Sequence, residues 1–393
     1  MNVEFVLWVL AAGIALVGLW PFGPYQLTLL AARTLFGPVP VRTARETEGA
    51  SRETFAICVC AHNEEAVIEQ KIRNMLDIRD AAGEGVEILL YCDGCTDRTV
   101  EIARRFEPDV KVIASEERRG KFHGLNSLAQ AARATILIFT DANVRVDRNL
   151  VPVLRQYFAD PRIGCVDVPL RHANPDATPT AEVGTTYWRF EEWTKRLETD
   201  TGSIIGADGS CYAIRKRLFR TLGPGVCDDF HVSMSALVQG ARVVSAREVV
   251  AEEVYATRAE DEFRRRLRIA AQVVHSHSAL WPEISRLDLW HRYKYLSHRV
   301  ARWASGACLL GAVVFAAGAA GVRFGALSIA TGVAAFTALF ATALLLGNKI
   351  VLRLWNAIVS FGGTTMGLCH GLLGRRQAIW DPVPSSRVPI PGD

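Results

Sequence analysis

Long runs without a charged residue constrain this sequence more than any other feature. No Asp, Glu, Lys or Arg occurs between Glu4 and Arg33, over 303–322 or over 324–348. Each run reaches the roughly 20 apolar residues that a helix needs to cross a bilayer. We therefore expect three membrane-spanning helices, the first within an N-terminal segment over 1–51.

A fourth apolar run, over 354–374, is weaker. It is rich in glycine and is interrupted by His370. Basic residues flank it on both sides, namely Lys349, Arg353, Arg375 and Arg376. Because positive charge at both ends opposes a full crossing, we expect an interfacial or re-entrant helix here, with a fourth crossing as the alternative. Spanning and interfacial helices would together fill 304–375.

The basic residues after the first run indicate its orientation. The run has no basic stretch before it and is longer than the apolar core of a signal peptide. It is followed by Arg33, Arg42, Arg45 and Arg52, which by the positive-inside rule place the next domain in the cytoplasm. We expect a multi-pass protein of the plasma (inner) membrane, with 376–393 as a cytoplasmic tail. The net charge of +4 is too small to indicate nucleic-acid binding.

The segment over 281–303 has an amphipathic pattern. Trp290, Tyr293, Val300 and Trp303 fall near one helical face, with Arg and Lys on the others. This pattern is typical of helices that lie on an anionic membrane surface. We expect interfacial helices that contact membrane lipids, and a solvated helix leading into the next span is the alternative.

Between the apolar runs, residues 52–280 predict an α/β domain. FAICVCAHNEE, VEILLYCDGCTD, KVIASEERRGK and ATILIFTDAN each combine an apolar run with a polar end, as buried parallel strands do. Helical stretches separate them, which predicts a mostly parallel, Rossmann-like sheet with helices on both faces. Ligands bind beyond the carboxyl ends of such strands, so the polar ends predict a nucleotide-sized site.

The C-x-x-C spacing of Cys92 and Cys95 allows a second interpretation, a redox pair or, with Cys58 and Cys60, a zinc site. A C-x-C pair on an extended strand lacks the turn of a zinc knuckle, and a cytoplasmic location disfavours disulfides. We expect free thiols that pack as small apolar side chains and a strand-terminal turn at Asp93.

Six motifs follow one another in a fixed order: AHNEE, YCDGCTD, RRGKFHGLN, TDAN, GADGSCYAIRK and CDDF. In this order, over about residues 55–268, they resemble the membrane-bound inverting glycosyltransferases of family 2. The resemblance implies a GT-A fold, a nucleotide-sugar donor with UDP as the nucleotide, and a role in polysaccharide or cell-envelope glycan synthesis. Each motif is a weak signal alone, and their common order carries the resemblance.

For the donor, the resemblance assigns Glu64 and Asp93, together with the neighbouring Asn63, to the base and ribose. It assigns Lys121 to the nucleotide. Carboxylates are acceptors that suit uracil N–H and ribose hydroxyl groups. Helix capping by Asn63 or Asp93 is the alternative.

The resemblance also assigns Arg268 to the diphosphate. Processive relatives have Q-x-x-R-W in this region, whereas this chain has Arg265-x-x-Arg268-Ile269. The absent Gln and Trp predict non-processive transfer. Binding to lipid head groups is the alternative for Arg264 and Arg266.

Asp141-Ala142-Asn143 matches the D-x-D position of the family, which implies that Asp141 and Asn143 hold a divalent cation, Mg²⁺ or Mn²⁺. An amide replaces the second carboxylate. Hard cations gain most from charged oxygen ligands, so we expect metal dependence with weaker affinity than at a site with two carboxylates.

On the acceptor side, Asp229 of CDDF matches the general base of the family, and Asp208 and Gly209 match its acceptor loop. We expect Asp228 and Asp229 on a strand or extended loop, where consecutive side chains point in opposite directions. Only one of them would then face the acceptor.

Four aromatic residues precede the GADG motif: Tyr187, Trp188, Phe190 and Trp193. Their near-helical spacing predicts packing in the core or at a membrane surface. Stacking on acceptor sugar rings is the alternative.

These expectations converge on transfer of a sugar to a hydroxyl of a glycan or lipid-linked saccharide. A polyprenyl-phosphate acceptor is a close alternative that needs no general base. A catalytically degenerate membrane scaffold is another, which Asn143 favours. A hydrolase needs two facing carboxyl groups about 5 to 9 Å apart, which the adjacent Asp228 and Asp229 do not supply.

Overall fold

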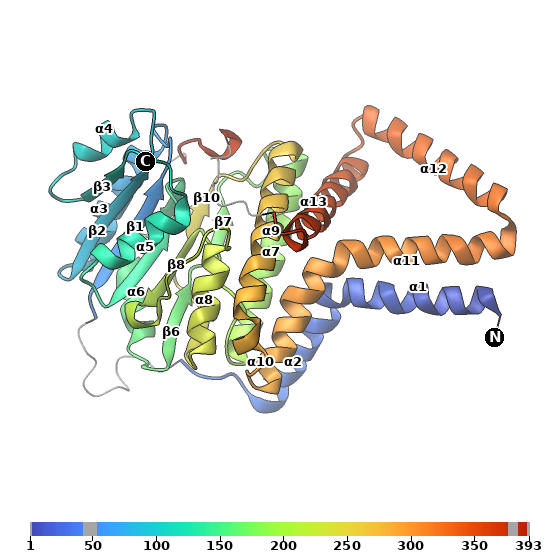
Figure 1. Cartoon of the computed structure of the whole chain (residues 1–393), viewed down its shortest axis with the longest axis horizontal. Helices are drawn as coiled ribbons and strands as arrows, with labels where there is room; N and C mark the ends of the chain where they lie inside the picture. Colours follow the sequence, from blue (N-terminus) through green and yellow to red (C-terminus); the bar gives the residue numbers. More distant parts are fainter. Residues whose placement is uncertain (1, 42–52, 376–383, 391–393) are drawn as a thin grey trace.

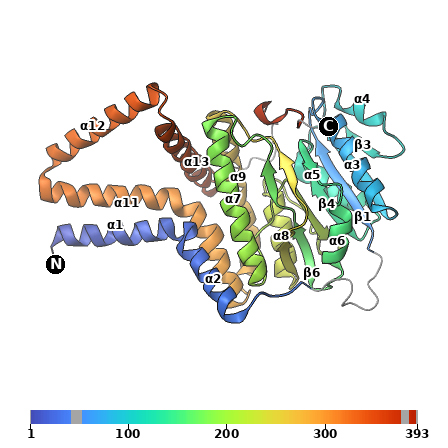
Figure 2. The same cartoon turned by 180° about the vertical axis from the view of Figure 1, so that it is seen from behind.

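The computed structural model describes residues 2–41, 53–375 and 384–390. An α/β domain carries a group of packed helices on one side, and further helices extend away from that group (Figure 1; Figure 2). The packed helices are α2 (Pro24–Phe36), α7 (Pro179–Asp200), α9 (Ala259–Ile284) and α13 (Lys349–Leu372). The extended helices are α1 (Val3–Leu19), α11 (Ala301–Phe324) and α12 (Ala326–Leu345).

A seven-stranded sheet forms the centre of the α/β domain, in the order β3-β2-β1-β4-β8-β6-β9. Its strands are β1 (Phe55–Ala61), β2 (Val86–Asp93), β3 (Lys111–Ser115), β4 (Ile136–Thr140), β6 (Ile163–Asp167), β8 (Cys211–Arg215) and β9 (Arg242–Ser245). Neighbouring strands are parallel except that β8 is antiparallel to β4 and β6, which confirms the mostly parallel sheet. A smaller sheet has the order β5-β10-β7, from β5 (Val144–Val146), β7 (Leu170–His172) and β10 (Ala251–Glu253).

Two hydrophobic cores cover the two faces of the large sheet, because alternate residues of a strand point to opposite sides. Ile57 and Val59 of β1 pack in one core, and Cys58 and Cys60 in the other. The first core includes α3 (Ile68–Ala82), α4 (Thr99–Arg104) and α6 (Leu150–Phe158), and the second α5 (Lys121–Ala131) and α8 (Asp228–Val238). Every residue of β1 is buried, as expected for a strand covered on both faces.

The first apolar run is divided between two helices. After α1 a 3-10 turn, η1 (Trp20–Phe22), precedes α2, and both elements begin at or next to a proline. Proline fits the first turn of a helix but interrupts the helix before it. α2 packs on α7, and its Tyr25 and Leu29 are fully buried. The charge-free run is therefore longer than the helix that extends from the domain.

Within the described residues, three helical segments are long and apolar enough to cross a membrane: Val3–Phe22, Leu289–Phe324 and Ala326–Leu345. This number agrees with the three crossings expected from the sequence. The second segment combines α10 (Leu289–Lys294), a π-helical turn η3 (Tyr295–Val300) and α11. α1 and α11 lie side by side in both views (Figure 1; Figure 2).

The aromatic face expected on a membrane surface packs inside the protein instead. Trp290 and Tyr293 stack with ring centroids 5.4 Å apart, against α2 and α7. Trp290 Nε1 also donates to the Thr201 carbonyl oxygen at 2.9 Å, while Val300 and Trp303 pack against the core beneath α8 and α9. The prediction was wrong for these side chains because a helix that packs on protein has the same apolar period as one that lies on lipid. α9 also continues past the domain boundary expected at 280.

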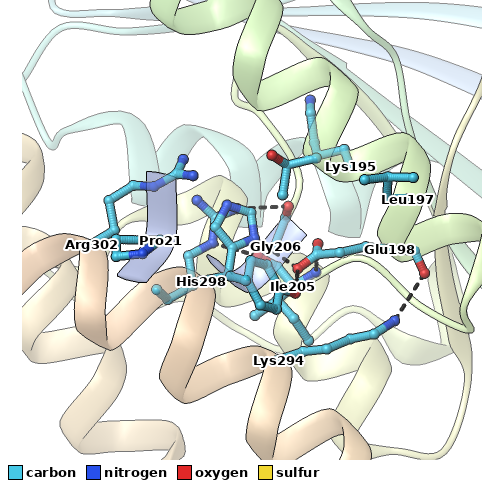
Figure 3. A network of polar contacts seen from close by, with 12 residues as sticks. Pro21, Lys195, Leu197, Glu198, Ile205, Gly206, Lys294, His298 and Arg302 are labelled. Carbon is cyan, nitrogen blue, oxygen red and sulfur yellow. Dashed lines mark hydrogen bonds and ion pairs between the residues drawn. The ribbon is translucent and has the colours of Figure 1, made fainter. Parts of the chain in front are cut away.

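A buried polar network holds the start of the second candidate span against α7 (Figure 3). Glu198 accepts hydrogen bonds from the Tyr25 hydroxyl and, at 3.0 Å, from the Ile205 backbone N–H. His298 Nδ1 lies 2.8 Å from the same carboxylate, and Lys294 donates to the Glu198 carbonyl oxygen at 2.9 Å. Burial alone would raise the pKa of Glu198, but His298 and Lys294 lower it to about 2. Glu198 is therefore ionised inside the protein and holds its hydrogen-bond partners in place.

α13 is docked along α9 and, among the described residues, is not one of the candidate spans; the interfacial helix over 354–374 stays a prediction. Its glycines at 363, 367 and 371 are buried and face α9. A Cβ atom added to Gly367 would lie 2.3 Å from the Leu267 carbonyl oxygen. Side chains as small as glycine allow two helix backbones to approach this closely.

Substituting Gly367 should therefore separate the two helices. We expect Gly367→Ala to lower the free energy of unfolding by about 1–3 kcal/mol, the usual range for overpacking, in thermal or denaturant unfolding in detergent. Gly362 offers a matched control in the same helix, since no atom lies within 4 Å of its added Cβ. Gly362→Ala should leave stability unchanged or raise it, because Ala is the better helix former. Equal effects of both variants would contradict this packing.

Candidate active site

A cavity of about 140 Å³ opens at the carboxyl ends of β1 and β4. Seven of the site residues predicted from the sequence line it: Glu64, Lys121, Asp141, Asp208, Gly209, Asp229 and Arg268. They come from the loops after β1 and β4, the start of α5, the loop before β8, and helices α8 and α9. Segments that are distant in sequence thus meet at one edge of the sheet.

Lys121 connects two acidic residues in this cavity. Its Nζ atom lies 2.9 Å from Asp141 Oδ1 and 2.9 Å from Asp228 Oδ2. Burial disfavours the charged amine, but the two carboxylates outweigh burial and raise the pKa of Lys121 well above its usual value. Burial likewise opposes ionisation of Asp141, yet Lys121 lowers the pKa of that carboxyl group. An anionic ligand entering the cavity would meet a permanently charged lysine.

Asp228 and Asp229 occupy the first turn of α8, so the strand or extended loop expected for them is wrong. Acidic residues are favoured in this position because the N-terminus of a helix is electropositive. Asp228 is turned toward Lys121, whereas Asp229 lies against Gly209, where an added Cβ would be 3.1 Å from Asp229 Oδ2. Asp229 lines both this cavity and a second one beside it. The two side chains point in different directions, as expected, but they do so from a helix and not from an extended strand.

The acceptor-side carboxyl groups hold protons more tightly than usual. Burial, and after it the charge of Asp228, raises the pKa of Asp229. Burial raises the pKa of Asp208 to about 7, although Lys195 opposes the shift. The backbone N–H of Asp208 donates to Asp167 Oδ1 at 2.8 Å, which fixes the loop. A carboxyl group with a pKa of about 7, as at Asp208, can exchange a proton near neutral pH.

The C-terminal segment contributes an arginine that sequence reasoning missed. Arg387 Nε lies 2.8 Å from Glu64 Oε2, and both residues line the cavity. Gln70 holds the segment through hydrogen bonds of 3.0 and 3.1 Å with the backbone of Ile390. Burial raises the pKa of Glu64 to about 7 even though Arg387 lowers it. Glu64 and Arg387 are 323 positions apart, and no local pattern signals such a contact.

Asn63 and Asp93 support the surrounding loops and are not among the residues that line the cavity. Asn63 Oδ1 accepts from the Thr96 backbone N–H at 2.8 Å. Asp93 is fully buried, and its two carboxylate oxygens accept from the backbone N–H groups of Arg119 and Gly120, each at 2.8 Å. These bonds fix the basic loop that precedes α5.

Asn143 lies behind the cavity wall rather than in it. Its Nδ2 atom donates to Glu253 Oε1 at 2.9 Å, and Glu253 does line the cavity. The Oδ1 atom of Asn143 is buried and has no hydrogen-bond partner among the described residues. Glu253 reaches this point because β10 pairs antiparallel with β5 and sets Glu253 opposite Val144. A carboxylate from β10 thus lies next to the position where the D-x-D pattern lacks one.

The described part of the chain has no group of three or more His, Cys, Asp and Glu side chains arranged to hold a metal ion. Among the side-chain oxygen atoms in or beside the cavity are those of Asp141, Glu253 and the Asn143 amide. Two carboxylates and an unpartnered amide oxygen fit a hard divalent cation.

Two arginines of α9 line the cavity, Arg265 and Arg268. Burial, with Arg265 close by, lowers the pKa of Arg268, and Arg268 has no ion pair within the part of the chain that the structure describes. Such a guanidinium is available to a bound anion. Arg264 and Arg266 instead pair with glutamates one turn away and do not line this cavity.

Comparison with known proteins identifies the domain. Residues 56–223 match the model of Glycosyl transferase family 2. A beta-monoglucosyldiacylglycerol synthase of Synechocystis sp. is 31% identical over 123 residues, 30% of this chain and 26% of that protein. The synthase of the same name from Trichormus variabilis is 24% identical over 190 residues, 47% of this chain and 40% of that one. The chain thus spans less than half the length of these relatives.

A solved mannosyltransferase of Pyrobaculum calidifontis, in complex with GDP-Man and Mn²⁺, has the same fold. Its TM-score is 0.68 at 23% identity, and the match covers 94% of this chain and 100% of that one. The fold, the order of the motifs and the family match agree. Residues 56–223 match glycosyl transferase family 2, and the α/β domain has the GT-A fold.

Proposed function

We propose that this protein is a membrane-bound inverting glycosyltransferase that transfers a sugar from a nucleotide sugar, with UDP as the nucleotide, to a hydroxyl group of a saccharide. One observation carries the proposal: the half-buried carboxylate of Asp229 lines both the cavity around Lys121 and Asp141 and the second cavity. A donor in the first cavity and an acceptor in the second would react beside Asp229. The family 2 domain supports this chemistry.

In the proposed reaction, the acceptor oxygen forms a bond to the anomeric carbon while the bond between that carbon and the donor diphosphate breaks. The acceptor proton moves to Asp229, and the nucleoside diphosphate leaves. A single displacement of this kind inverts the configuration at the anomeric carbon. Asp229 has to be ionised to accept the proton, and its pKa is raised. The rate should therefore fall on the acid side at a higher pH than for an ordinary carboxylate base.

Lys121 and Arg268 would stabilise the negative charge of the departing diphosphate, because fixed cations act strongly in a partly dry site. Phosphate oxygens can replace one of the two carboxylates that pair with Lys121 in the ligand-free protein. Arg268 has no ion pair to break within the described residues. Both cations lie in the cavity that also holds Asp229.

A divalent cation, Mg²⁺ or Mn²⁺, would be held by Asp141 and Glu253, with the unpartnered Oδ1 atom of Asn143 as a neutral ligand. When bound, such an ion supplies further positive charge to the donor diphosphate. Glu253 restores the negative charge that Asn143 removes from the D-x-D pattern. With Glu253 as a ligand the site has two carboxylates, so we no longer expect the weaker metal affinity that Asn143 alone would give.

The membrane placement is part of the proposal. Three candidate spans and the arginines that follow the first of them support an inner-membrane protein with its catalytic domain on the cytoplasmic side. The product would be a cell-envelope glycan or glycolipid made by single additions, since the Gln and Trp of the processive motif are absent.

The central test is Asp229→Asn in the full chain, reconstituted in nanodiscs with Mn²⁺, a panel of UDP- and GDP-linked sugars and a membrane extract as the acceptor source. Nucleoside diphosphate release should fall by about 10² to 10⁴-fold, the usual contribution of a positioned base. The rise in Tm on donor binding should persist. Asp109→Asn, which removes an exposed carboxylate paired with Arg79, should leave both values unchanged.

Full activity of Asp229→Asn would instead favour an acceptor that needs no base, such as a lipid phosphate. No donor-induced rise in Tm in the unmodified protein would contradict an enzyme and favour a scaffold.

The second test concerns the cation. Glu253→Gln keeps the size of the side chain and removes its charge, so Mn²⁺ affinity in the presence of UDP should fall at least about tenfold, the typical loss at an altered metal site. Free Mn²⁺ is measured by electron paramagnetic resonance. The adjacent Glu252 pairs with Arg145 and Arg171, and Glu252→Gln should bind Mn²⁺ like the unmodified protein. Equal affinity in all three proteins would exclude Glu253 as a ligand.

A further inference from the structure

The second cavity, of about 270 Å³, is continuous with the acceptor side of the active site. It shares Asp208, Asp229 and Arg265 with the first cavity. Most of the rest of its wall comes from α7, α9, α13, η3, the start of α11 and the turn η1. These elements are separate from the start of α5 and the loop after β4, which carry Lys121 and Asp141 in the first cavity.

Most of this wall is apolar, and it lies where two candidate spans meet the domain. Apolar side chains that line it are Val183, Trp188, Ile269, Val273 and Phe361. Phe22, the last residue of the first candidate span, also lines it, as does Trp303 near the start of α11. Because α1 and α11 lie side by side (Figure 2), an apolar chain leaving the cavity here would pass directly into the proposed bilayer.

Positive charge is concentrated inside the same cavity. The arginines that line it are Arg265, Arg266, Arg299 and Arg302, and the glutamates are Glu191 and Glu262. Arg266 pairs with Glu262 at 2.6 Å, while Arg299, at 3.5 Å, and Arg302 share Glu191. Lys195, Asp208 and Asp229 also line the cavity. The local excess of positive charge therefore lies at Arg299 and Arg302, which share one carboxylate.

Buried donors in this wall lack partners. Arg302 is only 8% exposed, and its Nε and Nη2 atoms make no hydrogen bond to any described residue. The Trp188 Nε1 atom is also buried without a partner there. Burial alone would raise the pKa of Tyr187, but Arg302 and Arg266 lower it to about 7. Unpaired buried donors are costly, and an anion placed among them would satisfy them.

We propose that this cavity binds the acceptor as a lipid whose head group carries a phosphate between its sugar and its apolar chain. The inference rests on the function proposed above and specifies its acceptor. The phosphate would lie among Arg266, Arg299 and Arg302, and the chain would follow the apolar wall toward α1 and α11. The sugar of the head group would reach Asp229.

The positions of the charges also indicate which group reacts. Arg266, Arg299 and Arg302 line the second cavity but not the first, whereas Asp208 and Asp229 line both. A phosphate that attacked the donor directly would have to lie beside these two carboxylates, which repel it. A sugar hydroxyl meets no such repulsion, so the lipid phosphate holds the acceptor and the hydroxyl attacks.

The test measures binding of farnesyl phosphate to the full chain in phosphatidylcholine nanodiscs by microscale thermophoresis, with farnesol and inorganic phosphate as the two partial probes. We expect farnesyl phosphate to bind at least about tenfold more tightly than either, because charge-assisted hydrogen bonds and apolar burial both contribute. Arg302→Gln should weaken farnesyl phosphate binding about tenfold and leave farnesol binding unchanged.

Two further variants separate charge from shape. Ala357 lines the cavity from α13, so Ala357→Phe should weaken both farnesyl phosphate and farnesol by filling the space for the chain. Arg353→Gln, which removes an arginine paired with Glu182 outside the cavity, should change neither. Equal affinities for farnesol and farnesyl phosphate, or no effect of Ala357→Phe, would overturn the inference. Inorganic phosphate that binds as tightly as farnesyl phosphate would also overturn it.

Donor binding is measured on the same samples, as the rise in Tm with Mn²⁺ and a nucleotide sugar. A variant that keeps this rise is folded, so loss of lipid binding then reflects the cavity. If the unmodified protein binds the donor but not farnesyl phosphate, the inference fails alone. If the donor does not bind, the proposed function fails whatever the lipid does.

Discussion

Two buried carboxylates on one face of α7 hold the start of the second candidate membrane span against the catalytic domain. Glu191 and Glu198 are seven residues apart, about two helical turns, and His298 lies between them, with Nδ1 2.8 Å from Glu198 and Nε2 3.1 Å from Glu191 (Figure 3). Removing one partner from a buried ion pair typically costs about 3–5 kcal/mol, because the other charge is left uncompensated. A rotation or shift of η3 along α7 would break both contacts, so the network specifies one arrangement of these helices.

This arrangement has consequences for the active site. One turn beyond His298, Arg302 pairs with Glu191, and the next residue after His298, Arg299, donates to the backbone carbonyl of Gly206 at 2.9 Å. Gly206 belongs to the loop that continues to Asp208, which lines both cavities. The helix that enters the candidate membrane span therefore also holds the acceptor loop. Movement of that helix would change the shape of the second cavity and the position of Asp208 together.

The parts of the site that sequence could predict are those set by local pattern. Asp141 directly follows the buried strand β4, and Lys121 follows the loop after β3. Because parallel strands end at a common edge, their meeting could be predicted. The motif CDDF indicated Asp229. Its helical conformation could not be predicted, because two consecutive acidic residues fit the start of a helix as well as a loop. The three spans could be predicted because an uncharged apolar run of about 20 residues matches the thickness of a bilayer when it forms a helix.

Other parts depend on contacts that no local pattern encodes. Glu253 reaches Asn143 through the pairing of β10 with β5, and Arg387 reaches Glu64 across most of the chain. Both are single charged residues in short segments, and their neighbours are known only once the fold is known. The aromatic face of Trp290 and Tyr293 was assigned to lipid because amphipathic periodicity indicates one apolar side without indicating what covers it.

The division of the site between two sets of elements has a functional consequence. Lys121, at the start of α5, and Asp141, directly after β4, lie within residues 56–223, the region that matches the family model. Arg266, Arg299 and Arg302, with all of α13, lie beyond residue 223 and shape only the second cavity. Substitutions in η3, α11 or α13 can therefore change the second cavity without touching Lys121 or Arg268, which line only the first. Under the proposed function, the motifs describe the donor side and part of the acceptor side of the reaction, and acceptor recognition also depends on η3, α11 and α13, which the motifs do not reach.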